Sequence, residues 1–286
     1  MTIIDFIHAL TEYDFLQKAL VTSVMVGIIC GVIGCFIILR GMSLMGDAIS
    51  HAVLPGVAIS YLLGINFFIG AVATGLLTAL GIGFVSQNSR IKNDTAIGIL
   101  FTSAFALGII LISFLRSSSD LYHILFGNVL AVRPSDMWMT LAIGLLVLAA
   151  IFLFYKELLV TSFDPTMAAA YGLSTRLIHY LLMTMLTLVT VASLQTVGII
   201  LVVAMLITPA ATAYLLTNRL SRMIFLSAGL GTISSVIGLY FSFTYNLSSG
   251  ASIVLVATAL FALVFIFSPR HGLLRKWKSA KKELTT

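Results

Sequence analysis

The sequence has 286 residues, of which 60% are hydrophobic and 9% are charged, and its formal net charge is +6. This composition excludes a soluble globular protein, in which about a quarter of the residues are charged, and predicts a polytopic membrane protein. It also argues against a nucleic-acid-binding protein, because the basic residues lie in short connections and a tail between apolar segments.

The first 16 residues carry the acidic side chains Asp5, Glu12 and Asp14 and lack the basic start of a signal peptide. We therefore expect residues 1–16 to form a short N-terminal segment outside the first membrane span.

Nine apolar stretches follow, and each is long enough to cross roughly 30 Å of hydrocarbon. Their approximate ranges are 17–40, 48–64, 66–86, 95–115, 136–155, 177–194, 196–217, 223–245 and 250–268. The boundary between the sixth and seventh stretches rests only on Gln195, so a count of eight stays open. The predicted fold is an all-α bundle of about nine transmembrane helices in a single domain, residues 1–286.

The second apolar stretch begins with a charged pair, Asp47 and His51. Side chains four residues apart lie on one face of a helix, and a carboxylate with an imidazole provides two ligands for a divalent transition metal. Ionisable groups are costly in a membrane, so they point to function. The alternative is structural: Asp47 caps its helix and His51 makes an internal hydrogen bond.

Two ligands are too few for Mn²⁺, Fe²⁺ or Zn²⁺. A second copy of the chain, related by a twofold axis, would supply the same pair again, so the sequence predicts a homodimer with the ion path at its interface. Ligands without a thiolate favour Mn²⁺ or Zn²⁺ over Cu⁺. Cys30 and Cys35 lie about 140° apart on one helix and are not expected to pair or chelate.

The basic residues predict the orientation of the chain. With the N-terminus outside, thirteen of the 16 Lys and Arg residues fall on the cytoplasmic side, and only Lys18, Arg116 and Arg133 fall outside. The sequence therefore predicts a cytoplasmic basic tail, residues 269–286, that anchors the chain on anionic lipid.

Two connections are longer than a turn. Residues 116–135 are expected on the outer side, either as a short re-entrant helix or as a packed loop, and we favour the re-entrant helix. Residues 156–176 are expected on the cytoplasmic side. There Asp164 and Pro165 begin a helix of about two turns that Gly172 ends, and a helix this short should dock on the bundle or on a partner.

Small residues recur in several spans and predict close contacts between helices. They are Gly27, Gly31, Gly34, Gly98, Gly108, Gly229, Gly231 and Gly238. Among the other histidines, we expect His179 to be a satisfied interface residue, and His8 and His271 to be solvated; His123 has no assigned role.

The chain has no phosphate-binding loop of the G-x-x-x-x-G-K-[ST] type, so ATP-driven transport would need a separate ATPase. A proton-driven carrier would be expected to place several Asp, Glu or His residues in its spans. A stand-alone ion-coupled carrier and a membrane scaffold remain the alternatives to a permease subunit.

Four segments carry a resemblance to a known family. They are residues 41–56, residues 123–128, Ser162-Phe163-Asp164 and residues 203–213. Over about residues 14–268 the chain resembles the permeases of bacterial manganese, zinc and iron ABC importers. It is most similar to the manganese permeases of Gram-positive bacteria such as streptococci.

This resemblance implies a type II importer in the bacterial cytoplasmic membrane. Its expected parts are a permease dimer, a cytoplasmic ATPase dimer and an extracellular metal-binding lipoprotein, with no bound cofactor and no catalysis by the permease itself. It implies that Asp47 and His51 bind the transported Mn²⁺, or Zn²⁺ or Fe²⁺. It also implies that residues 163–172, with Phe163, Asp164 and Gly172, couple the permease to the ATPase.

Overall fold

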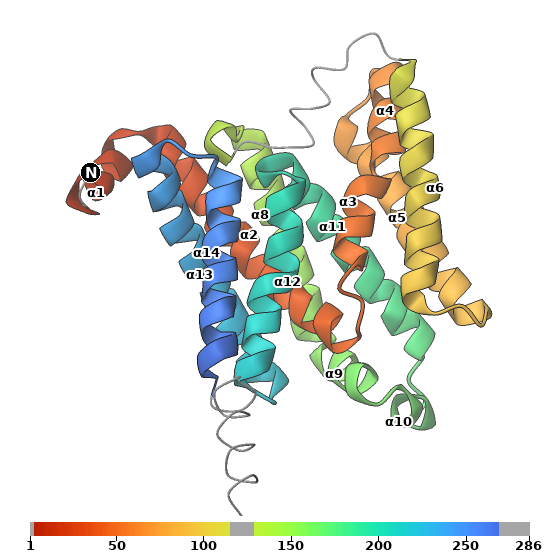
Figure 1. Cartoon of the computed structure of the whole chain (residues 1–286). Coiled ribbons are helices and arrows are strands. Elements are labelled where there is room, and N and C mark those ends of the chain that lie inside the picture. The colour runs from red at the N-terminus through yellow and green to blue at the C-terminus, as the bar shows by residue number, and fades with distance from the viewer. Residues whose placement is uncertain (1–2, 115–128, 269–286) are drawn as a thin grey trace, which may run out of the picture.

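The computed structural model describes residues 3–114 and 129–268, and all its regular elements in these ranges are helices (Figure 1). In chain order they are α1 (Ile3–Glu12), α2 (Asp14–Leu39), α3 (Met45–Ala52), α4 (Leu54–Leu63), α5 (Phe67–Asn88), α6 (Asn93–Ser113), the 3₁₀ turn η1 (Val129–Ala131), α8 (Pro134–Leu153), α9 (Tyr155–Phe163), α10 (Pro165–Ala170), α11 (Thr175–Val197), α12 (Ile199–Leu216), α13 (Leu220–Tyr245) and α14 (Ser249–Phe267).

Nine segments of the described chain are long and apolar enough to span a membrane, with α3 and α4 counted together as one. The prediction of nine spans is confirmed. The division that the sequence left open falls at Gly198, whose φ of +82° separates α11 from α12. This backbone conformation suits glycine and interrupts the helix three residues beyond Gln195.

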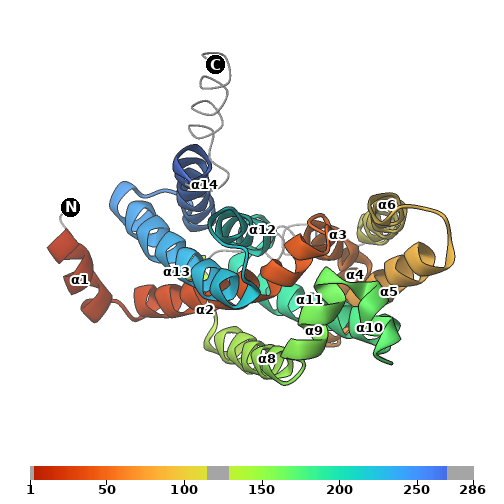
Figure 2. The same cartoon turned by 90° about the horizontal axis from the view of Figure 1, so that it is seen from below.

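Helix α2 crosses the middle of the bundle and packs on α8, α11, α12 and α13 (Figures 1 and 2). The seam between α2 and α13 is held by small residues. A side chain on Gly27 would meet the Gly231 backbone at 2.9 Å, and the Ser227 hydroxyl donates a 2.8 Å hydrogen bond to the Gly31 carbonyl. The close helix contact predicted for these glycines is confirmed, and it brings the backbones of α2 and α13 together.

Two of the predicted packing glycines do not fit this explanation. A side chain on Gly98 or Gly229 would meet no atom within 4 Å, so these two glycines do not let helices of this chain approach. Gly34, Gly108 and Gly238 do lie against neighbouring helices.

Helix formation extends beyond the predicted spans at two places. Helix α1 lies within the segment 1–16, and its Phe6 is buried in contact with the rings of Tyr240 and Phe243 on α13. Helix α9 follows α8 after a break at Phe154, where a loop was expected. Apolar contact explains both helices: Leu158 of α9 is fully buried.

The two cysteines are free and buried, as expected. The Cys35 thiol donates to the Gly31 carbonyl within α2, whereas Cys30 faces Ser193 of α11. Both serve as small core residues.

The ends of the bundle differ in charge. The connections and adjoining helix ends at the lower end of Figure 1 carry most of the basic residues of the described chain, whereas Lys18 lies in the first turns of α2 and Arg133 directly before α8, at the upper end. The lower set comprises Arg40, Arg90, Lys92, Lys156, Arg176, Arg219 and Arg222.

Some predictions concern residues outside the described ranges. These are most of the segment 116–135 with His123, and the basic tail 269–286 with His271; the end of the first contains η1. His8 is exposed on α1, in agreement with a solvated side chain.

Candidate functional site

Asp47 and His51 lie in the first and last turns of the eight-residue helix α3. Their spacing places them on one face, with 3.6 Å between His51 Nε2 and Asp47 Oδ1. The Asp47 side chain is 43% exposed and the His51 side chain 30% exposed. The two groups are too far apart for a strong hydrogen bond, but close enough for both to approach one cation.

The structural alternative for this pair is wrong. The residue that precedes α3 is Leu44, and no side chain caps the helix; Asp47 is its third residue. His51 has no hydrogen bond in the described part of the chain, and its closest polar partner is Asp47. Neither the predicted cap nor the predicted internal hydrogen bond is present, and the two side chains approach each other only as an i,i+4 pair at 3.6 Å.

The opposite face of α3 fixes the pair in place. A side chain on Gly46 would meet Leu206 Cδ1 of α12 at 2.7 Å, and Ile49 is fully buried. The Ser50 hydroxyl donates to the Gly46 carbonyl and is satisfied within the helix. Because this face is packed tightly, Asp47 and His51 lie on the face that remains partly open.

The chain bends out of α3 at Val53, and α4 begins with Leu54 and Pro55. Proline has no N–H, so the carbonyl of His51, four residues earlier, loses its usual helical donor. The single second span expected over residues 48–64 is therefore two helices, and the break at Val53 lies two residues after His51.

Two aromatic side chains of α6 flank the His51 ring. The ring centroids lie 5.7 Å apart for Phe101 and 5.4 Å for Phe105, which meets the imidazole edge to face. The sequence interpretation missed these two residues. The only available signal was their spacing of four, which is also that of ordinary core residues.

The candidate site in one described chain consists of the pair Asp47 and His51. The described ranges contain no group of three or more His, Cys, Asp or Glu side chains that could hold a metal ion. The second copy of the chain, expected because two ligands are too few for the ion, stays a prediction. Metal binding by Asp47 and His51 stays a prediction.

The predicted cytoplasmic helix is present as α10, at the lower end of Figure 1. The Asp164 carboxylate accepts a 2.9 Å hydrogen bond from the Met167 amide, and Pro165 is the first helical residue. Gly172, with a φ of +79°, ends the turn that follows. Phe163, just before the cap, is 58% exposed.

The helix thus begins at Pro165, as the sequence predicted, and ends at Ala170, one residue before the predicted end at Tyr171. Helix α10 packs on α9 and the start of α11. Its outer surface, with Met167, is exposed. An exposed apolar side chain on this short helix is available for contact with a partner protein.

Comparison with known proteins assigns the chain to a family. The model of the "ABC 3 transport family" matches residues 12–268. Over 279 residues the chain is 70% identical to the manganese transport system membrane protein MntC of Listeria innocua, covering 98% of this chain and 99% of that one. It is 56% identical over 272 residues to the manganese import system permease protein ScaB of Streptococcus gordonii, covering 95% and 98%.

Solved structures agree. The fold matches a chain of PsaBC from Streptococcus pneumoniae in complex with Fab, with a TM-score of 0.86 and 55% sequence identity over 96% of this chain and 99% of that chain. An inward-facing, putative metal-chelate type ABC transporter shares the fold with a TM-score of 0.69 at 16% identity, covering 87% and 84%. With the match over residues 12–268, the chain is a member of the ABC 3 transport family.

Proposed function

We propose that this chain is the permease subunit of an ATP-driven importer that carries Mn²⁺ across the bacterial cytoplasmic membrane. The similarity to MntC of Listeria innocua over nearly the whole of both chains supports manganese as the substrate. The observation that carries the mechanism is the Asp47–His51 pair on the open face of α3.

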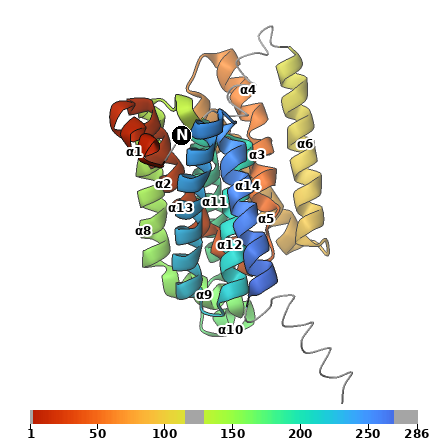
Figure 3. The same cartoon turned by 60° about the vertical axis from the view of Figure 1, so that its left-hand side comes forward.

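The pair suits a transported ion better than a resident one. One carboxylate and one imidazole form an incomplete ligand set, and a transport site must release its ion. A second permease copy about a twofold axis would add two more ligands. Helix α6 carries the two rings beside His51 and lies at the edge of the bundle next to α4 and α5 (Figure 3), so we place the second copy against this edge.

We assign ATP hydrolysis to a separate cytoplasmic ATPase dimer that docks on α10, and metal delivery to an extracellular metal-binding lipoprotein. Phe163, Asp164 and Gly172 would shape the docking segment. The basic connections at the lower end of Figure 1 support a cytoplasmic position for α10, with the N-terminus outside and the C-terminus inside.

A second candidate substrate is iron. The chain is 42% identical over 257 residues to a probable iron transport system membrane protein of Haemophilus influenzae. The same carboxylate and imidazole also suit Zn²⁺.

The test is uptake by the assembled complex in vesicles loaded with ATP, with Mn²⁺, Zn²⁺ and Fe²⁺ in competition. We expect Mn²⁺ to be taken up and to require the ATPase and the binding protein. Transport by the chain alone under a proton gradient would instead identify a stand-alone carrier.

A further inference from the structure

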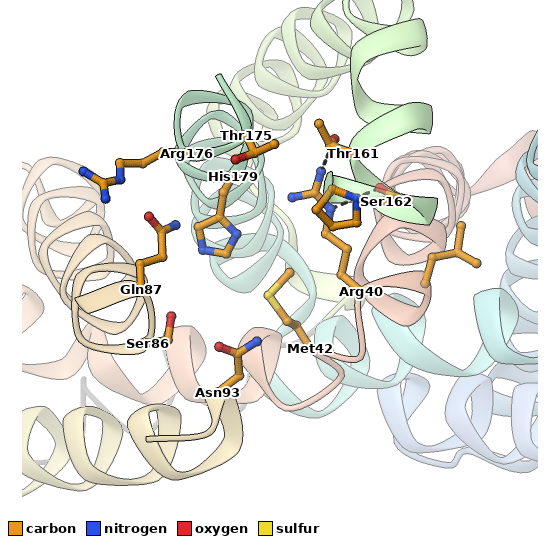
Figure 4. A pocket seen from close by; sticks show the side chains of 12 residues that line it. Arg40, Met42, Ser86, Gln87, Asn93, Thr161, Ser162, Thr175, Arg176 and His179 are labelled. Carbon is orange, nitrogen blue, oxygen red and sulfur yellow. Dashed lines mark hydrogen bonds between the residues drawn. The ribbon is translucent and has the colours of Figure 1, made fainter. Parts of the chain in front are cut away.

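A second polar site lies at the lower end of the bundle, where a cavity of about 580 Å³ opens beside α10 (Figure 4). Its wall is built from the ends of α2, α5 and α9 and the starts of α6, α10 and α11. This volume lies within the range of small-molecule sites. The proposed transport function uses none of the side chains of this wall.

Arg40 is the charged group inside the cavity. Its Nε donates a 3.1 Å hydrogen bond to Ser162 Oγ, and its Nη2 donates a 2.7 Å hydrogen bond to Thr161 Oγ1. Both hydroxyls in turn donate to backbone carbonyls of α9. The positive charge therefore has neutral partners only, and no carboxylate of the described residues lies within 4 Å of Arg40.

Burial removes water from the Arg40 guanidinium, and no opposite charge replaces that water. It lowers the pKa of the guanidinium to about 10, so the group is still charged at neutral pH. A guanidinium has five N–H donors, and only two of them are used here. The remaining donors are free to bind an anion.

The rest of the wall adds donors and no negative side chain. Figure 4 shows His179, Asn93 and Ser86 around the opening, with Arg176 at the rim and its guanidinium directed outward. Three helices begin and three end at the wall, so the positive and negative ends of their dipoles offset one another. The electrostatic potential in the cavity is therefore positive because of the arginines.

We propose that this cavity binds the phosphate group of an anionic ligand. Arginine presents paired donors that match phosphate oxygens, and hydroxyl and amide groups complete such sites. The ligand is either free inorganic phosphate or the headgroup of an anionic phospholipid. A bound phosphate would link Arg40, at the end of α2, to the start of α11, next to Pro165 of α10.

The test measures phosphate binding by the full 286-residue chain purified in detergent. The ATPase is left out of the sample because its nucleotide site would bind phosphate as well. Inorganic phosphate should raise the midpoint of thermal unfolding in a saturable way, whereas chloride at equal ionic strength should not.

Three variants locate the effect. Arg40→Gln should weaken the apparent phosphate affinity about tenfold, and Arg176→Gln about threefold because its side chain is exposed. Arg90→Gln removes the same charge from an exposed position outside the cavity and should bind phosphate as the parent chain does. If Arg40→Gln does not fold, Arg40→Lys keeps the charge but loses the paired donors, and it replaces that variant.

A lipid measurement separates the two sources. Stabilisation by inorganic phosphate in lipid-free detergent identifies free phosphate as the ligand. Stabilisation by phosphatidylglycerol, but not by a glycolipid without phosphate, assigns the headgroup. Stabilisation by either ligand supports the site if the stabilisation is lost in the variant at Arg40. No stabilisation by either ligand, or equal stabilisation of all variants, overturns the proposal.

Discussion

Helix α2 and the α3–α4 segment are buried to nearly the same extent, with 72% and 67% of their most apolar 18 residues inside the chain. Their mean hydropathies, however, are 2.6 and 1.2. Helix α2 buries small and aliphatic residues against α13, whereas α3 keeps a carboxylate and an imidazole on its open face. Burial therefore identifies the core of this protein, and the polar side chains that remain within a buried span identify its candidate site.

The strongest test of this contrast removes the charge of α3. Asp47→Asn should lower Mn²⁺ uptake about 100-fold or more, because it takes one ligand from an already sparse set. Radiolabelled Mn²⁺ uptake in cells that lack their own importer measures the change, and an immunoblot of membranes measures the amount of protein.

Asp94→Asn is the matched control, since Asp94 is an exposed acid in the first turn of α6. It should transport normally. Normal uptake by the Asp47 variant, or its loss from the membrane, would contradict a ligand role for this residue.

The converse change introduces a methyl group into α2. Gly27→Ala should destabilise the protein by about 2 kcal/mol, because the new Cβ would lie 2.9 Å from the Gly231 backbone. The midpoint of thermal unfolding in detergent provides the measurement. The fraction of the Gly27→Ala variant that folds should keep the preference of the parent chain among Mn²⁺, Zn²⁺ and Fe²⁺.

Gly98→Ala, in a helix with open space at that position, is the control and should be neutral or stabilising by up to about 1 kcal/mol. If both variants unfold at the same temperature, the tight seam between α2 and α13 does not govern stability.

A substitution outside α2 and α3 tests whether transport also requires the docking segment around α10. Phe163→Ala should lower ATP-driven uptake about tenfold by removing an exposed aromatic contact, while ATPase activity persists uncoupled. Uptake and hydrolysis are measured together in vesicles. Phe152→Ala removes an equally large exposed ring from α8 and should leave both rates unchanged; equal losses in the two variants would refute a coupling role.

The smallest expected effect concerns the aromatic contact with His51. Phe105→Leu should raise the KM for Mn²⁺ about threefold without loss of protein, because an edge-to-face contact contributes about 0.5–1.5 kcal/mol to holding the ring. Phe84→Leu, at an exposed position of α5, should leave KM unchanged. A fall in maximal rate at constant KM would indicate that Phe105 acts on a later step.

Local patterns predicted much of this structure. The apolar runs gave nine spans, and Asp164, Pro165 and Gly172 gave the limits of α10 to within one residue. The spacing of Asp47 and His51 predicted their shared face. Each of these features depends on residues close together in sequence, where helix geometry alone fixes the outcome.

Features formed by distant residues were not predictable in this way. Arg40 and Arg176 share a cavity wall although 136 positions separate them, and Phe105 reaches His51 from another helix. Helix α9 was missed because Lys156 and Glu157 resemble the polar end of a span, whereas contact of Leu158 with the bundle sustains the helix. Tertiary packing decided these cases.

The backbone turn at Gly198 has a consequence for the whole molecule. By dividing one long apolar run into two candidate spans, it makes the number of candidate spans in the described chain odd, and an odd number of crossings predicts that the two chain ends lie in different compartments. Fluorescent or enzymatic reporters fused to the two termini should therefore give opposite signals. A substitution that straightened this turn into continuous helix would bring both reporters to the same side.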